Sequence, residues 1–121
     1  MNYRVLPALA CAALVLGGCS FQNKYEREAE SITRAVMAND LAPVEKDLAS
    51  GLHVTRVQIA AASDELDAQG KLLSIKENAT CPVVGAHCFT VKFEKHTYNE
   101  MLAIDDQGKV TAWKYKMADA P

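Results

Sequence analysis

The four cysteines of this chain carry its most reactive side chains, and they fall into two groups. Cys11 and Cys19 lie near the start, whereas Cys81 and Cys88 lie close together in the second half. A cysteine thiolate can take up a lipid, form a disulfide or bind a metal. The choice among these reactions depends on the compartment, so the start of the chain must be interpreted first.

The chain opens with the features of a secretory signal peptide. Arg4 gives the polar start a positive charge, and an apolar run from Val5 to Leu16 follows. This run is shorter than the roughly 20 residues that a membrane-spanning helix needs. We therefore predict a signal peptide over residues 1–18, with an uncleaved signal anchor as the alternative.

The end of this segment, Leu16-Gly17-Gly18-Cys19, resembles the lipobox of bacterial lipoproteins. Two small residues leave the backbone open to a peptidase, and the cysteine supplies the nucleophile that takes the lipid. The resemblance implies a diacylglycerol on the Cys19 thiol and an acyl chain on its amine. One acyl chain binds a membrane only marginally, whereas two or three anchor a protein firmly. An ordinary signal peptide with a chance cysteine is the alternative.

Cys81 and Cys88 are the pair left for the folded part. An even pair in an oxidising compartment predicts a disulfide. Their spacing differs from the Cys-x-x-Cys pattern of redox pairs. His87 adjoins Cys88, but neighbouring residues of a strand point to opposite faces, which disfavours a shared metal. We predict a Cys81–Cys88 disulfide, no metal site and no cofactor apart from the lipid on Cys19; a redox pair or a metal site are the alternatives.

A second set of chemistry-bearing residues consists of Glu94, His96, Tyr98 and Glu100. On one continuous strand they would share a face, as an acid–base site requires. We predict a turn at Lys95 and His96 that interrupts the run, and charged residues near a turn are usually solvated. Because no acid–base or nucleophilic motif is complete, we predict no catalytic residues.

The aromatic residues Tyr98, Trp113 and Tyr115 form our predicted binding surface. Tyrosine and tryptophan are enriched at binding hot spots. They are also ordinary core residues, and for Trp113 we favour core packing. The expected partners are an envelope protein or a small apolar ligand. The formal net charge of −2 argues against nucleic acid as a partner.

Helical periodicity covers the first half of the mature chain. We expect a first helix from Tyr25 to Met37 and a third from His53 to Gln69. Between them we expect a short second helix that Asp40 caps, with Leu41, Val44 and Leu48 as its apolar stripe. Thr55 is a plausible N-cap of the third helix, and Gly70 is well placed to end it.

From Lys71 onward the apolar period changes from 3.6 to 2. Strands are predicted around Leu73 and Ile75 and over residues 89–93, 98–104 and 110–115, with a hairpin turn at residues 105–108. Helices followed by strands indicate an α+β fold. We predict N-terminal helices packed on a curved, mostly antiparallel sheet of about four strands.

Residues 58–115 are similar to small bacterial lipoproteins of the cystatin-like, or nuclear-transport-factor-two-like, superfamily. The segments that carry the resemblance are Asp64-Glu65-Leu66, Gln69-Gly70-Lys71, Phe89-Thr90-Val91-Lys92-Phe93, Asp105-Asp106-Gln107-Gly108-Lys109-Val110 and Trp113-Lys114-Tyr115. That superfamily contains isomerases, dehydratases, transport factors and binding modules, so the fold alone does not choose a function.

The expected organisation is a signal peptide at 1–18, a lipidated N-terminus and linker at 19–24, and a single α+β domain at 25–121. Ser20 after the cysteine is similar to the pattern of outer-membrane sorting, which implies the inner leaflet of the outer membrane and a domain in the periplasm. We expect a membrane-anchored, non-catalytic binding or interaction module. A small-ligand-binding cone, an isomerase- or dehydratase-like enzyme and a structural envelope protein are the alternatives.

Overall fold

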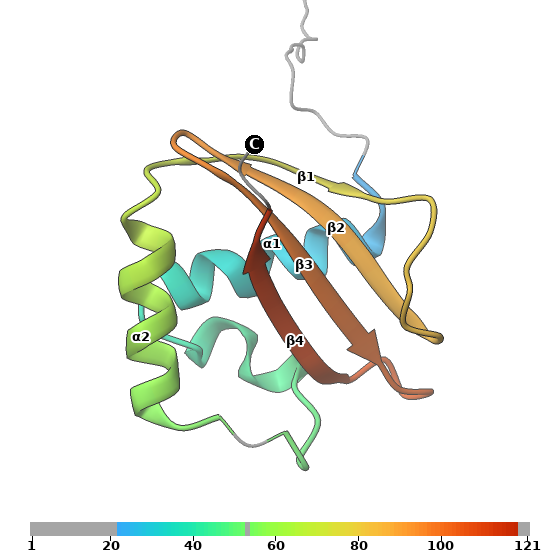
Figure 1. The fold of residues 1–121 in the computed structure, drawn as a ribbon. Coiled ribbons are helices and arrows are strands. Elements are labelled where there is room, and N and C mark those ends of the chain that lie inside the picture. The colour runs from blue at the N-terminus through green and yellow to red at the C-terminus, as the bar shows by residue number, and fades with distance from the viewer. Residues whose placement is uncertain (1–21, 53, 119–121) are drawn as a thin grey trace, which may run out of the picture.

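The computed structural model describes residues 22–52 and 54–118, in which helices precede a four-stranded sheet (Figure 1). The elements are α1 (Lys24–Met37), the 3-10 helix η2 (Ala42–Asp47), α2 (Arg56–Asp67), β1 (Leu72–Glu77), β2 (Ala86–Phe93), β3 (Thr97–Ile104) and β4 (Val110–Met117). This order confirms the α+β prediction. The predicted signal peptide, Cys19, Ser20 and His53 lie outside the described residues.

The sheet has the order β1-β2-β3-β4, and each strand pairs antiparallel with the next. Figure 1 shows it curving over α1, with α2 upright at one side. Alternate residues of the strands face the helices and form the core. The largest fully buried side chains are Tyr98, Phe89, Leu66, Leu102, Val36, Val91, Val110 and Thr33. One face of the sheet is therefore covered, as its alternating pattern predicts.

A capping box begins α1 and ties it to β1. Asn23 Oδ1 accepts from the Glu26 N–H at 2.7 Å, and Glu26 Oε1 accepts from the Asn23 N–H at 2.9 Å. The other oxygen, Glu26 Oε2, accepts from the Glu77 N–H in β1 at 2.6 Å. Asn23 and Lys24, which we predicted to lie in the linker, are therefore already part of the fold.

The predicted second helix is a 3-10 helix, and Leu48 does not belong to it. The N-cap of this helix is Leu41 rather than the predicted Asp40, although Asp40 Oδ1 accepts from the Ala42 N–H at 3.0 Å. At the other end, Leu48 forms a parallel bridge with Val110, and the Ala49 N–H donates to the Val110 carbonyl at 2.8 Å. This contact with β4 holds Leu48 in an extended conformation and ends the helix before it.

Thr55 is the N-cap of α2, as predicted, in a second capping box with Gln58. The helix therefore begins at Arg56 rather than at His53. After it, the chain turns at Gly70, where φ is 85°. This backbone conformation favours glycine, and a Cβ here would lie 2.5 Å from Glu94 Oε1 and 3.0 Å from Glu94 Cβ, so the Glu94 side chain would have to shift.

The apolar period of 2 that we predicted from Lys71 onward fails at the start of β1, so Leu73 and Ile75 do not share a buried face. Ile75 is buried, but Leu73 is 61% exposed. The register between β1 and β2 shifts between Leu72 and Ser74, so the strict alternation is lost at this point.

Candidate apolar binding site

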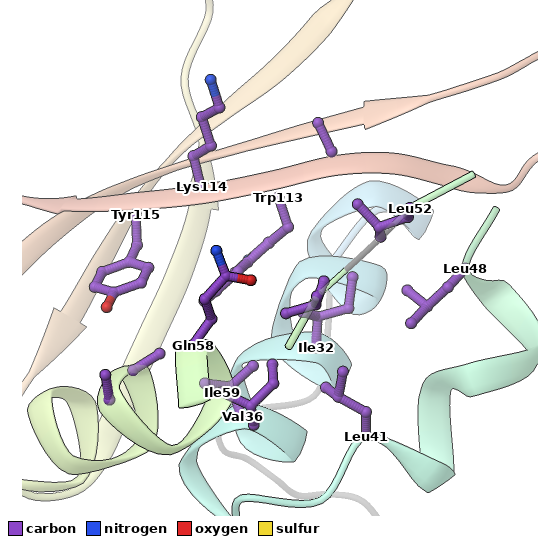
Figure 2. Close-up of a pocket in the computed structure, with 14 residues that line it drawn as sticks. Ile32, Val36, Leu41, Leu48, Leu52, Gln58, Ile59, Trp113, Lys114 and Tyr115 are labelled. Atoms are coloured by element: carbon purple, nitrogen blue, oxygen red, sulfur yellow. The ribbon is translucent and has the colours of Figure 1, made fainter. Parts of the chain in front are cut away.

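A pocket of about 610 Å³ lies between β4 and the helices (Figure 2). Its walls come from α1, from the segment between α1 and α2, from the first half of α2 and from the middle of β4. The lining residues are Ile32, Val36, Leu41, Leu48, Leu52, Val54, Gln58, Ile59, Ala61, Ala62, Ala112, Trp113, Lys114 and Tyr115. Ligand sites have volumes of about 300–1,000 Å³ and mostly apolar walls, so this pocket has the size and character of one.

Trp113 and Tyr115 form the wall that β4 contributes. Their side chains point from β4 toward the helices, whereas that of Lys114 points to the other side of the sheet (Figure 2). The two ring centroids are 5.3 Å apart. Both residues are half-buried, so part of this wall is accessible to solvent. Of our three predicted surface aromatics, these two line the pocket.

Tyr98 is not a surface residue. It is fully buried in the core. Its hydroxyl donates to Glu65 Oε2 at 2.8 Å, and the Tyr115 hydroxyl donates to Glu65 Oε1 at 3.4 Å. Burial and the Glu65 carboxylate raise the pKa of both phenols above their usual value. Glu65 thus fixes the outer ends of both rings while both remain neutral.

Glu100 is the most deeply buried carboxyl of the described residues, with an exposed fraction of 3%. It lies on β3 opposite Tyr115, and its Oε1 accepts from the Trp113 indole N–H at 3.1 Å. Burial raises the pKa of Glu100 to about 7, and its hydrogen bonds with Thr33 and Trp113 oppose part of that rise. The expectation that the charged residues of this stretch are solvated is therefore wrong for Glu100.

Thr33 shows why a neutral Glu100 fits its surroundings. Thr33 Oγ1 lies 2.8 Å from the Ala29 carbonyl oxygen and 2.8 and 2.9 Å from the two oxygens of Glu100. A hydroxyl has one proton to donate. When that proton goes to Ala29, Thr33 can only accept from Glu100, and only a protonated carboxyl donates. The neutral form thus satisfies all three groups at once.

The four residues that we weighed as an acid–base site, Glu94, His96, Tyr98 and Glu100, do not lie together in one site. Glu94 and His96 lie in the turn between β2 and β3, and the predicted turn at Lys95 and His96 is confirmed. Glu94 Oε1 accepts from the Lys71 N–H at 2.8 Å, and His96 Nδ1 lies 2.6 Å from Gln69 Oε1. Both residues therefore hold the end of α2 against the sheet, while Tyr98 and Glu100 lie in the core.

The disulfide between Cys81 and Cys88 is present, and it closes the loop between β1 and β2. His87, next to Cys88, interacts with two other residues. Its Nδ1 lies 2.7 Å from Glu77 Oε2, and its ring stacks on Tyr25 with ring centroids 3.8 Å apart. Within residues 22–52 and 54–118, we find no group of three or more metal-ligating side chains.

The sequence did not predict the aliphatic residues that line the pocket opposite β4. Leu41 and Leu48 were predicted as the buried stripe of a helix, but both line the pocket, and only Val44 of that stripe is buried. Leu52 and Ile59 also line the pocket, and the sequence carries no signal for them beyond their being apolar. An apolar residue in a ligand pocket has the same sequence signature as one in the core.

Among the described parts of the chain, no helix has the length and apolar character needed to cross a membrane. Comparison of the whole chain with protein-family models, curated proteins and solved structures gives no significant match. The resemblances to bacterial lipoproteins and to the cystatin-like superfamily therefore stay predictions from the sequence.

Proposed function

We propose that this protein is a lipid-anchored binding module of a bacterial cell envelope and that its pocket receives an apolar group without catalysing a reaction. The observation that carries the proposal is the pocket of about 610 Å³ between β4, α1 and α2. Its volume and mostly apolar lining are those of sites that receive small apolar groups. Two aromatic side chains, those of Trp113 and Tyr115, form a wall of this pocket that stays partly accessible to solvent.

The lipid anchor rests on the sequence Leu16-Gly17-Gly18-Cys19 and on where the fold begins. Arg27 already donates to the Gln22 carbonyl at 2.7 Å, so the fold is established within a few residues of Cys19. A flexible coil this short spans roughly 10 Å, because its length grows as about 5–6 Å times the square root of the residue number. An anchor at Cys19 would hold the domain close to a membrane surface.

The position of Glu100 favours binding over catalysis. Its two oxygens are engaged by Thr33 and Trp113, and it is not among the residues that line the pocket. A general acid or base must come within hydrogen-bond reach of its substrate. Glu100 instead holds the Trp113 indole in place, which makes it a positioning residue for the pocket wall.

The pocket can be tested with Trp113 itself, because it is the single tryptophan of the chain. A dansyl-labelled fatty acid added to the non-lipidated Cys19→Ser form should receive excitation energy from Trp113 and should saturate. Ile59→Glu places a charge in the pocket and should abolish the signal. The matched control is Val84→Glu, since Val84 is 98% exposed and lies outside the pocket. Equal transfer in all three proteins, or none in any of them, would remove the basis for the proposal.

The anchor can be tested separately by growing cells with a labelled fatty acid. The label should enter the wild-type protein and should be lost in Cys19→Ser. A Cys19→Ser protein that still carries the label would refute lipidation at this residue. A structural envelope protein, the alternative function, would carry the lipid and bind no apolar probe.

A further inference from the structure

The outer edge of β4 is open beside the pocket. β4 is the last strand of the sheet, and on its outer side the described residues pair with it only at Val110, through Ala49. On its inner side, Ala118 donates to Thr97, and Lys116 stands opposite Asn99. Backbone groups in an antiparallel ladder alternate between the two sides. The groups that point away from β3 are therefore those of Trp113, Tyr115 and Met117.

The segment at Leu48 and Ala49 already pairs with the first residue of this edge. Leu48 runs parallel to β4 at Val110, and its side chain enters the pocket. After Ala49 the chain turns at Ser50 and Gly51, and no described residue forms a backbone hydrogen bond with the outer edge at Trp113 and beyond. A second extended segment could continue along β4 from there, with hydrogen bonds to its backbone and a side chain beside Leu48. This is strand addition to a free edge.

Charge indicates what kind of segment fits. Trp113 and Tyr115 face the pocket, whereas Lys114 and Lys116 are exposed and alternate with them on the other face. In a strand paired with β4, every second side chain would lie over the pocket, and the others would lie beside the lysines. Opposite charges across a strand pair are stabilising, and like charges are destabilising. A second copy of β4 would set lysine against lysine, which disfavours self-pairing.

We propose that the occupant is an extended peptide segment of a partner protein, in which apolar and acidic residues alternate, added as a fifth strand to the free edge of β4. This inference rests on the proposed binding function of the pocket and names what the pocket receives. The apolar side chains would enter it between Trp113 and Ile59, while the acidic side chains would pair with Lys114 and Lys116. Edge lysines also protect sheets from unwanted pairing, and the test below separates that role from recognition.

The test uses the whole mature protein in phospholipid vesicles and follows Trp113 emission. The probe is a blocked synthetic peptide of alternating isoleucine and glutamate, as long as β4, which has 8 residues. Two further peptides carry N-methyl groups, one on every isoleucine amide and the other on every glutamate amide. In an extended strand these two sets of amides lie on opposite edges. The unmethylated peptide should saturate, and one methylated isomer should bind at least about tenfold more weakly, because it loses its donors to β4.

The other isomer should keep its affinity, because its methyl groups point to solvent. Lys114→Glu with Lys116→Glu should weaken binding of the unmethylated peptide, whereas Lys92→Glu, on the same face of the sheet but in β2, should not. Equal binding of both isomers, equal loss of both, or no binding of the peptide would overturn the inference. If the fatty-acid probe still binds when the peptide does not, only this inference fails; if neither binds, the proposed function fails as well.

Discussion

Replacing Glu100 with glutamine should remove a pH dependence from the stability of this domain. Glutamine has the shape of glutamic acid and can reproduce the hydrogen bonds of its neutral form. Its oxygen can accept from the Trp113 indole N–H, and its amide can donate to Thr33 Oγ1. The variant therefore keeps the packing of the core and loses only the ability to ionise.

The magnitude follows from the pKa of Glu100, which burial raises from 4.5 to about 7. The folded protein holds this proton more tightly than the unfolded chain does. The stabilisation by the neutral carboxyl is therefore complete below pH 4.5 and is lost as the pH rises through 7. At about 1.4 kcal/mol per pKa unit, the full effect is roughly 3 kcal/mol. Between pH 5 and pH 8, most of it, about 2–3 kcal/mol, should be lost.

The assay is urea unfolding of both proteins at pH 5 and pH 8, followed by far-ultraviolet circular dichroism. The wild-type free energy of unfolding should fall between the two pH values by about 2–3 kcal/mol more than that of Glu100→Gln. Other titrating groups, such as Glu30 with its lowered pKa, are the same in both proteins and cancel in the difference. Parallel pH profiles for the two proteins would show that Glu100 does not titrate with a raised pKa in the fold.

Two further predictions concern stability. Cys81→Ser with Cys88→Ser should lower the free energy of unfolding by about 2.5 kcal/mol, since the disulfide closes a short loop, and a reductant should then shift the urea midpoint of the wild type only. Asn23→Ala should lower it by about 1 kcal/mol through loss of the capping box, and Gln107→Ala, at an exposed turn residue, serves as the control. A Cys81/Cys88 variant as stable as the wild type, or an Asn23 variant as stable as the Gln107 control, would contradict these assignments.

Local patterns of the sequence predicted the order of the elements well. The helical stripe of residues 25–37 and the alternation of residues 89–93 each depend on residues a few positions apart, so both are readable without the fold. The N-cap at Thr55 and the disulfide are local in the same way. These features fixed the α+β class and the packing of one sheet face on helices.

The errors arise where distant segments meet. Leu48 is extended because Ala49 bonds to Val110, more than sixty positions away in the sequence. Glu100 is buried because Thr33 of α1 and Trp113 of β4 both reach it across the core. The sequence did carry one signal for the burial of Glu100, because this residue alternates with the apolar Tyr98 and Leu102 on the same strand. The predicted turn at Lys95 and His96 favoured a solvated Glu100 instead, but this turn ends before β3 begins at Thr97.

The pocket depends wholly on such long-range contacts. Its walls combine residues 32–62 with residues 112–115, and the sequence gives no indication that the segment after η2 pairs with β4. Trp113 and Tyr115 were predicted as binding aromatics by residue type alone. The structure adds the apolar surface that faces them.

The most direct test of the account is the indole N–H resonance of Trp113, which is a single signal because the chain has one tryptophan. In ¹⁵N-labelled Cys19→Ser protein, we predict that this resonance shifts progressively on titration with a fatty acid and that Ile59→Glu removes the shift. The indole lines the pocket and donates to Glu100, so it should sense an occupant directly. An unshifted indole resonance would contradict the assignment of this pocket as the binding site. This holds whether the fatty acid binds elsewhere on the protein or does not bind at all.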